Sequence, residues 1–527
     1  IDNITLHEIE ALNLVLTTKK AKGEQTMTTE VAIEKQKPDR KNREGWIVPK
    51  GEKASYFIGS GSHFTVHTFM SAFLTTYLLM IGVTPVISAT VMLVLRAWDA
   101  INDTLFGYLI DRVRFKPGKG WLSRWFFSGR YLPWFRIATF IIPFSMIVTF
   151  SVNTNAPMWL RVLQYAIGYL LYDTAYTLSF APWGCMLTSL TSNVEERTFI
   201  QSYSVLGQAL GLVPVLFLGT ALIAGNFGYT GSAILFAIYG FLLTLPALFF
   251  IKERIVSAPP PASDQRYSLK EMFRFMVKTK EFLLFELGQL IWGILATGGA
   301  YGLFVAYYIF GDANLALLFG LFQFLPTIIL LPFFPVIFKR INKITALQVA
   351  CFLILACGLV MYFIGPDGLM AARGLFYLLL IVHGTATVFV AVGSAMILPD
   401  IAEIAKYRTN TEHVGIIWSI HSTVTKLVSS LVVSLSLLIL GAYGWISVTA
   451  GSFEELKALN LQGIGLQTPQ ALQGLWDIMF LFPSIGFGMA ALVFLLVRID
   501  KNRIKTMIRA NTGEISREEA EGLLYGS

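Results

Sequence analysis

Residues 85–112, PVISATVMLVLRAWDAINDTLFGYLIDR, form an apolar stretch with two carboxylates in its second half. The stretch is long enough to cross a hydrocarbon core about 30 Å thick, which takes about 20 helical residues. An ionisable side chain at that depth costs at least about 2.5 kcal/mol on insertion scales, so Asp99 and Asp103 each need a partner or a function. The stretch therefore predicts a membrane-spanning helix that carries a polar site.

Similar apolar windows recur from Ser55 to Val497 with only short polar breaks. Of 527 residues, 55% are hydrophobic and only 14% are charged, which excludes a soluble enzyme. We predict an all-α membrane protein with twelve transmembrane helices. The approximate spans are 55–81, 85–110, 135–152, 158–187, 200–224, 231–251, 282–308, 314–338, 344–364, 371–398, 415–442 and 475–498.

Basic residues are concentrated in every second connection, which by the positive-inside rule predicts that both termini are cytoplasmic. The net charge of +8 therefore reports topology, and no nucleic-acid partner is expected. The basic connections are Arg112–Arg136, Lys252–Lys280, Lys339–Lys343, Lys406–Arg408 and the tail from Arg498. The predicted parts are a cytoplasmic tail (1–54), a six-helix half (55–251), a cytoplasmic linker (252–281), a second six-helix half (282–498) and a cytoplasmic tail (499–527).

The central linker contains the run PPPAS at Pro259–Ser263 and has six spans on either side. Two six-helix halves around such a linker are typical of the major facilitator fold, in which the solute binds near the midplane between the halves.

The N-terminal residues 1–26 have neither the apolar core nor the cleavage site of a signal peptide. The residues Lys-Gly-Glu-Gln-Thr before Met27 could be encoded by a bacterial ribosome-binding sequence and a short spacer, so we expect translation to begin at Met27. The alternative is a disordered polar tail.

The cysteines, Cys185, Cys351 and Cys357, lie in or beside apolar segments, so the sequence predicts no disulfide framework and no zinc site.

Asp99 and Asp103 are four residues apart, so they share one face of the predicted helix. Two carboxylates this close repel each other in a low dielectric unless a cation, a proton or a basic side chain offsets them. Lys426, in the eleventh span, is the candidate counter-charge, and one monovalent cation would neutralise what remains. The alternative is a static ion-pair network between the halves. Arg96 is expected to be an internal counter-charge.

Asp173 and Thr177 in the fourth span share a face in the same way. Thr177 could offer its hydroxyl oxygen to a hard cation such as sodium, or bond to a carbonyl of its own helix. A carboxylate at the depth of Asp173 needs a donor, so we expect it either to face the solute or a proton, or to pair with Arg161 or another helix.

The remaining polar and aromatic candidates have weaker signals. His63 and His67 form HxxxH, but without HExxH a metal site is not expected, so they either are satisfied in the bundle or bind a polar solute. Glu286, at the start of the seventh span, is expected to reach the interface. The aromatic residues near the charges could stack on a sugar ring or pack in the core. These are Tyr172, Tyr176, Trp183 and Trp418.

RAWDAINDTLFGYLIDR at Arg96–Arg112, followed by GRYLPW, closely resembles the second span and next loop of the glycoside-pentoside-hexuronide:cation symporters, the melibiose permease family. The resemblance implies that Asp99 and Asp103 coordinate the coupling cation, with Thr177 and Lys426 at positions that the family uses around that site. It extends over nearly all of 55–497 at scattered landmarks. Those landmarks are EER at Glu195–Arg197, YYIFGDANL at Tyr307–Leu315, PDIAEIAKY at Pro399–Tyr407 and WSIHSTVTK at Trp418–Lys426.

The chain departs from the galactoside-binding members of that family. They carry Asp at the positions of Phe180 and His63, Arg at Val205 and Trp at Gly184, so galactoside binding of that type is not expected. Asp173, two turns from Phe180 on the same face, is expected to replace the missing carboxylate. The full set of predicted solute contacts is His63, Asp173, Tyr176, Trp183, His421, Ser422 and Thr425.

These observations predict a monomeric carrier in the plasma or inner membrane. It would couple the uptake of a glycoside or short oligosaccharide to Na⁺ or H⁺ by alternating access, without another cofactor. The alternatives are a carrier of a non-sugar amphiphile or lipid, and a non-transporting membrane sensor. In the fifth span, Gly207 and Gly211 are followed by Leu-Val-Pro, so the GP pair of drug antiporters is missing. The chain also lacks the nucleophile-base pair that an intramembrane enzyme would need.

Overall fold

The computed structural model describes residues 46–116, 118–255, 269–409 and 414–525. Ile47–Ser527 forms one compact unit, and of the preceding unit, Ile1–Trp46, only Trp46 is described. The predictions that concern Met27 and the proline run at 259–263 therefore lie outside the described residues.

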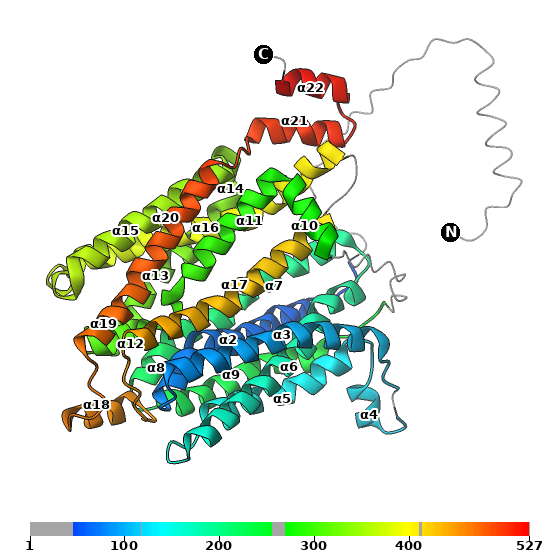
Figure 1. Ribbon diagram of the computed structural model, residues 1–527. Coiled ribbons are helices and arrows are strands. Elements are labelled where there is room, and N and C mark those ends of the chain that lie inside the picture. The colour runs from blue at the N-terminus through cyan, green and yellow to red at the C-terminus, as the bar shows by residue number, and fades with distance from the viewer. Residues whose placement is uncertain (1–45, 117, 256–268, 410–413, 526–527) are drawn as a thin grey trace, which may run out of the picture. The chain divides into compact units, whose positions relative to one another are not determined.

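The described chain is helical, and the first six predicted spans all fall on helices (Figure 1). Pro85 is at the first position of its helix, where its missing N–H leaves no hydrogen bond unmade. These helices are α2 (Lys50–Met80), α3 (Pro85–Arg112), α5 (Leu132–Phe150), α6 (Met158–Leu190), the run of α7 (Val194–Pro214), η1 (Val215–Gly219) and α8 (Thr220–Ala224), and α9 (Gly228–Phe250). The short α4 (Trp121–Phe126) lies between α3 and α5.

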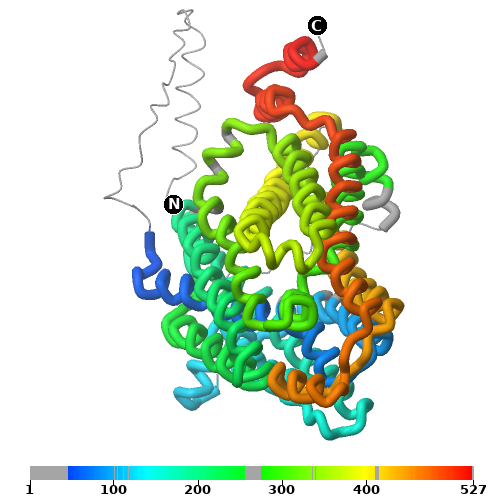
Figure 2. Tube along the Cα trace, turned by 90° about the vertical axis from the view of Figure 1, so that its left-hand side faces the viewer, coloured from blue at the N-terminus to red at the C-terminus, as the bar shows by residue number. Residues whose placement is uncertain are grey.

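The last six predicted spans also fall on helical runs. They are α11 (Lys280–Leu295) with η2 (Thr297–Ala300), α12 (Gly302–Phe304) and η3 (Val305–Ile309); α13 (Leu315–Leu330) with η4 (Leu331–Phe333) and α14 (Phe334–Arg340); α15 (Lys343–Ala371); α16 (Arg373–Thr409); α17 (Val414–Ala442); and α19 (Pro469–Trp476) with η5 (Asp477–Leu481) and α20 (Phe482–Leu495). Outside them are α10 (Leu269–Lys278), α18 (Phe453–Leu461), α21 (Lys501–Asn511) and α22 (Arg517–Tyr525). The last two follow α20 beyond the end of the bundle (Figure 2).

Eight helices in the described part of the chain are long and apolar enough to cross a membrane. The helices α2, α3 and α6 are not among them, because each carries several polar or charged side chains. An all-helical membrane protein is confirmed, and the full count of twelve spans stays a prediction. The polar content of these three helices has a structural reason, since all three line the same internal cavity, described below.

The helices before the linker contact mainly one another, as do those after it. α2 packs on α7 and α9, and α5 on α6 and α9, while after the linker α15 packs on α16 and α20, and α11 on α17 and α20. The largest contact between the two groups joins α3 to α17, which lie side by side in Figure 1. We call these groups the N-terminal and C-terminal halves.

The two ends of the bundle are packed differently. The end at which α9 finishes and α11 begins is called the linker end, and the opposite end is called the far end. Near the far end, one hydrophobic core includes residues of both halves, such as Tyr77, Tyr229, Tyr301 and Phe453. Toward the linker end, the N-terminal and C-terminal halves have separate cores. The halves are therefore held together at the far end and apart at the linker end.

A polar contact adds to this far-end closure. Ile81 and Thr449 form an antiparallel β-bridge, and the Ala450 amide donates to the Met80 carbonyl at 2.9 Å. Arg161 donates to the Ile81 carbonyl and, at 2.8 Å, to Thr449 Oγ1. Arg161 therefore belongs to the far-end contact. The donor to Asp173 is Asn102, so the predicted pair of Asp173 with Arg161 does not form in this structure.

Gly82 is required at this contact for two reasons. Its φ is +77°, a conformation that costs other L-residues roughly 1–2 kcal/mol, and a Cβ would overlap Thr449 Oγ1. Gly444 also has φ +77° but has open space around its Cβ position. We expect Gly82→Ala to lower the thermal unfolding midpoint of the purified protein more than Gly444→Ala does. Equal midpoints for the two variants would show that closeness to Thr449 contributes nothing to stability.

Candidate functional site

A cavity of about 960 Å³ lies between the halves. Its walls come from α2, α3 and α6 of the N-terminal half and from α17 of the C-terminal half. The charged side chains on it are Arg96, Asp99, Asp103, Asp173 and Lys426. We call it the central cavity. The tertiary structure thus brings together residues from the second, fourth and eleventh predicted spans.

Asp103 of the N-terminal half forms an ion pair with Lys426 of the C-terminal half. Lys426 Nζ lies 2.7 Å from Asp103 Oδ2, and the Thr177 hydroxyl donates to Asp103 Oδ1 at 3.0 Å. The Lys426 and Asp103 side chains are 51% and 43% exposed, so water reaches this ion pair through the cavity. Thr177 bonds to α3 in this arrangement, which makes its hydroxyl part of the carboxylate cluster.

Asn102 was not singled out from the sequence, yet it connects this cluster. It is fully buried, and its Nδ2 donates to Asp173 Oδ2 at 2.6 Å and to Thr177 Oγ1 at 3.1 Å. Its Oδ1 is buried and has no hydrogen-bond partner among the residues that the structure describes. A buried amide in an apolar span, next to Asp103 in sequence, was the signal that could have identified it. Asp173 thus has a donor from another helix.

Asp99 has a separate set of donors. The Tyr169 hydroxyl lies 3.2 Å from both of its carboxylate oxygens, and Arg96 lies 3.4 Å away, one turn earlier on α3. Arg96 therefore is an internal counter-charge, as expected. Tyr169 was not predicted, because its position one turn before Asp173 on α6 becomes meaningful only when α3 and α6 pack together.

The cluster is negative when all its groups are ionised, because three carboxylates face two cationic side chains. A bare negative charge in a low dielectric is costly, so a bound cation or proton would stabilise this arrangement. Carboxylate, hydroxyl and amide oxygens are the ligands that hard cations prefer. The unpartnered Asn102 Oδ1 beside Asp103 is consistent with such a ligand set. The donor set and charge of the cluster therefore suit a monovalent cation or a proton.

Of the seven predicted solute contacts, Asp173 and Tyr176 line the central cavity. The Tyr176 ring stacks on Phe180, with centroids 5.4 Å apart and planes at 10°, and Phe180 also lines the cavity. On the other face of Tyr176 lies His67, whose ring stacks at 5.1 Å and whose Nδ1 is 3.3 Å from the Tyr172 hydroxyl. His67 also lines the cavity but was not among the predicted solute contacts.

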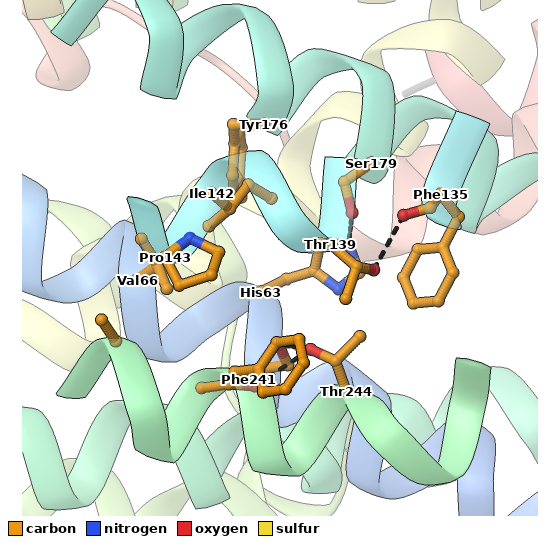
Figure 3. Close-up of a pocket in the computed structure, with 13 residues that line it drawn as sticks. His63, Val66, Phe135, Thr139, Ile142, Pro143, Tyr176, Ser179, Phe241 and Thr244 are labelled. Atoms are coloured by element: carbon orange, nitrogen blue, oxygen red, sulfur yellow. Dashed lines mark hydrogen bonds between the residues drawn. The ribbon is translucent and has the colours of Figure 1, made fainter. Parts of the chain in front are cut away.

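His63 lies elsewhere, in a small pocket of about 20 Å³ between α2, α5, α6 and α9 (Figure 3). It is buried, with Nε2 2.7 Å from Ser179 Oγ and Nδ1 3.2 Å from the Gly59 carbonyl. A pocket of that volume holds about one water molecule and no sugar. His63 and His67 have different hydrogen-bond partners and line different pockets, although both rings contact Tyr176.

Trp183, His421, Ser422 and Thr425 are not part of the central cavity wall. Trp183 is buried and stacks on Tyr56, with ring centroids 4.3 Å apart. His421 lies 3.0 Å from Glu286 Oε1. Glu286 is only 2% exposed, so the prediction that it reaches the interface is wrong, because the packing of α11 on α17 and α20 covers it.

Thr177 can be tested against a matched residue on the same helix. Thr174 lies on another face of α6, among Ile167, Leu171 and Leu178. If sodium binds at the cluster, it should stabilise the purified wild-type protein against heat, because a ligand that binds the folded state raises its stability. We expect Thr177→Val to reduce this sodium-dependent shift and Thr174→Val to keep it. Equal shifts in both variants would exclude Thr177 from the ion site.

Residues 60–501 match the family of MFS/sugar transport proteins. The chain is 24% identical over 478 residues to the uncharacterized symporter YnaJ of Bacillus subtilis, covering 87% of this chain and 94% of the relative. It is also 24% identical over 475 residues to the isoprimeverose transporter of Lactiplantibacillus pentosus, covering 86% and 90%. Its fold is similar to that of the nucleoside transporter NupG, with a TM-score of 0.55 and 13% identity over 85% of this chain and 98% of that one.

Proposed function

The chain belongs to the family of MFS/sugar transport proteins, and we propose that it imports a glycoside or short oligosaccharide together with Na⁺ or H⁺. As a member of this family it is a secondary transporter and not an enzyme. The observation that carries the proposal is the negative cluster of Asp99, Asp103 and Asp173 on the wall of a large cavity between the halves.

The cavity has the features that a sugar requires. A sugar ring presents apolar C–H faces, which stack on aromatic rings, and hydroxyls, which need acceptors and donors. The stacked rings of Tyr176 and Phe180 lie on the same wall as Asp173 and His67. A volume of about 960 Å³ is at the upper end of the usual range for small-molecule sites, so it accommodates more than a single sugar ring.

The cation site and the solute site share a residue network. Asp173 accepts from Asn102, and Asn102 donates to Thr177, which in turn donates to Asp103. A cation at Asp99 and Asp103 would change the charge that this network offers to a solute. If the cation raises the affinity for the solute, a solute bound at Asp173 raises the affinity for the cation by the same factor, because coupling between two ligands is reciprocal.

The packing of the two ends supports alternating access. The far end is closed by the shared core and by the contact of Ile81 with Thr449, whereas the halves have separate cores toward the linker end. With the linker end in the cytoplasm, as the positive-inside rule predicts, this arrangement is the inward-facing state. We propose that both termini are cytoplasmic and that the protein acts as a monomer.

Uptake of radiolabelled solutes tests this function. A panel of glycosides and short oligosaccharides, including isoprimeverose, would be presented to cells or vesicles with and without a sodium or a proton gradient. We expect concentrative uptake of at least one glycoside that requires one of the gradients. Uptake of a lysophospholipid or another amphiphile, with no glycoside taken up, would overturn the proposed substrate class.

We expect Asp99→Asn and Asp103→Asn each to abolish concentrative uptake but to leave exchange of the solute across the membrane. Removing one carboxylate removes the cation and leaves the stacked rings and Asp173 in place. Asp367→Asn is the control, since Asp367 is exposed on α15 and far from the cluster in the fold. Gradient-driven accumulation at the wild-type level in both cluster variants would contradict the cation site.

Asp173→Asn should instead raise the half-saturating solute concentration about tenfold or more, because a solute hydroxyl loses its acceptor at a cost of roughly 1–3 kcal/mol. The cation concentration that gives half-maximal uptake should change less than the half-saturating solute concentration does. If only the cation dependence moves, Asp173 belongs to the ion site.

A further inference from the structure

Glu286 and His421 form a second titratable pair, inside the C-terminal half. Glu286 is on α11 and His421 is on α17, and Glu286 Oε1 lies 3.0 Å from His421 Nδ1. Glu286 is 2% exposed, and within the described part of the chain its buried Oε2 has no hydrogen-bond partner. No residue of this pair lines the central cavity.

The surroundings of the pair are apolar. The Phe285 ring is 6.3 Å from the His421 ring and 6.2 Å from the Phe494 ring of α20, while Trp418 lies 6.2 Å from His421 on the other side. A lone carboxylate buried in such a place is strongly unfavourable. One proton shared by the carboxylate and the imidazole makes the pair neutral, either as carboxylic acid and imidazole or as carboxylate and imidazolium.

Most of the other charged groups on the neighbouring helices have partners of their own. Beside α11, α20 has no ionisable side chain between Phe482 and Leu495, and α10 brings Arg274 and Lys278 at the linker end. The ion pairs around α11 and α17 are Glu281–Arg408, Lys426–Asp103, Arg96–Asp99 and Lys343–Asp400. Glu403 is hydrogen-bonded to Asn511, and Asp477 to Tyr443. Arg112, Lys406 and Tyr407 also have interaction partners. Among the described residues, the contact with His421 is the only ion pair that involves Glu286.

We propose that Glu286 and His421 are a proton-binding site, separate from the cation cluster of the N-terminal half. The proton is taken from water and bound between Glu286 Oε1 and His421 Nδ1, and it leaves by the reverse step. The helix α17 connects the pair to the central cavity, because Lys426 lies five residues after His421 on it. Five residues correspond to about 7.5 Å along the helix and about 140° around it.

The helix α17 therefore makes two polar contacts through ionisable side chains. His421 contacts α11 within its own half, and Lys426 contacts Asp103 in the other half. When the proton leaves, the excess negative charge on Glu286 changes how α11 and α17 pack, and with it the position of Lys426. This consequence rests on the proposed symport, and it predicts that external or internal pH modulates uptake even if sodium is the coupling cation.

Proton binding itself can be measured without any solute. Trp418 is a built-in probe, since a protonated imidazole quenches the fluorescence of a neighbouring indole. The Trp418 signal is the difference between the purified protein and its Trp418→Phe variant, followed from pH 5 to pH 9. Infrared difference spectra over the same pH range report the carboxylic acid of Glu286.

We expect one protonation step in at least one of these two signals. Glu286→Gln should remove it or shift its proton affinity tenfold or more, and His421→Asn should do the same to the infrared signal. Glu281→Gln is the matched control, because it neutralises a carboxylate on the same helix that is paired with Arg408. If no step depends on Glu286 or His421, or if the control changes the step equally, the site does not exist. Should one of the two pair variants fail to fold, the other decides.

The link to transport has its own test, with the solute that the uptake panel identifies. Glu286→Gln should flatten the pH dependence of uptake by at least severalfold while sodium dependence stays. A protonation step that is present, with unchanged pH dependence of uptake in Glu286→Gln, would overturn the link and leave the symport intact. Failure of the symport itself would appear separately, as an absence of gradient-driven uptake in the wild-type protein.

Discussion

The contact of Lys426 with Asp103 is the ionic interaction that links the two halves across the central cavity. Asp103 is on an otherwise apolar helix, where an uncompensated carboxylate is costly, and the nearest compensating ammonium comes from the other half at 2.7 Å. Because α3 and α17 have to stay adjacent to keep this pair, the central cavity forms against their shared face. Both side chains remain reachable by water.

Closure of the far end follows from a different kind of interaction. There the halves share a hydrophobic core, and a β-bridge between Ile81 and Thr449 satisfies backbone groups that helix ends leave unpaired. Arg161 and the left-handed Gly82 fit this contact closely. Toward the linker end each half has its own core, so the halves can separate there without exposing a common one. Rocking of one half on the other therefore costs contacts mainly at the far end.

α17 combines these requirements in one helix. It packs on α3 of the N-terminal half and on α11 of its own half. Its Lys426 contacts Asp103 of α3, and its His421 contacts Glu286 of α11. Ionic contacts of this kind contribute little net stability compared with apolar packing. In the proposed mechanism each of these contacts is exchanged for a cation or a proton, so that a change of charge alters the position of the helix.

The sequence by itself determined the solvent, the helical ranges and the residues that could not be inert in lipid. Those properties depend on local composition, on spacing along one helix and on family landmarks, so Asp99, Asp103, Thr177 and Lys426 could be named before any packing was known, and the family is confirmed. Their role as a cation site stays a prediction.

Only the tertiary structure decided which polar groups meet. Asn102 and Tyr169 gained importance because α3 packs on α6, and Glu286 turned out to be buried because α17 and α20 cover α11. His63 and Trp183 share a face with good candidates yet contact small residues and rings inside the N-terminal half. Periodicity shows which residues share a face of one helix, but the neighbour of that face is set by contacts between segments distant in sequence, and no single helix encodes them.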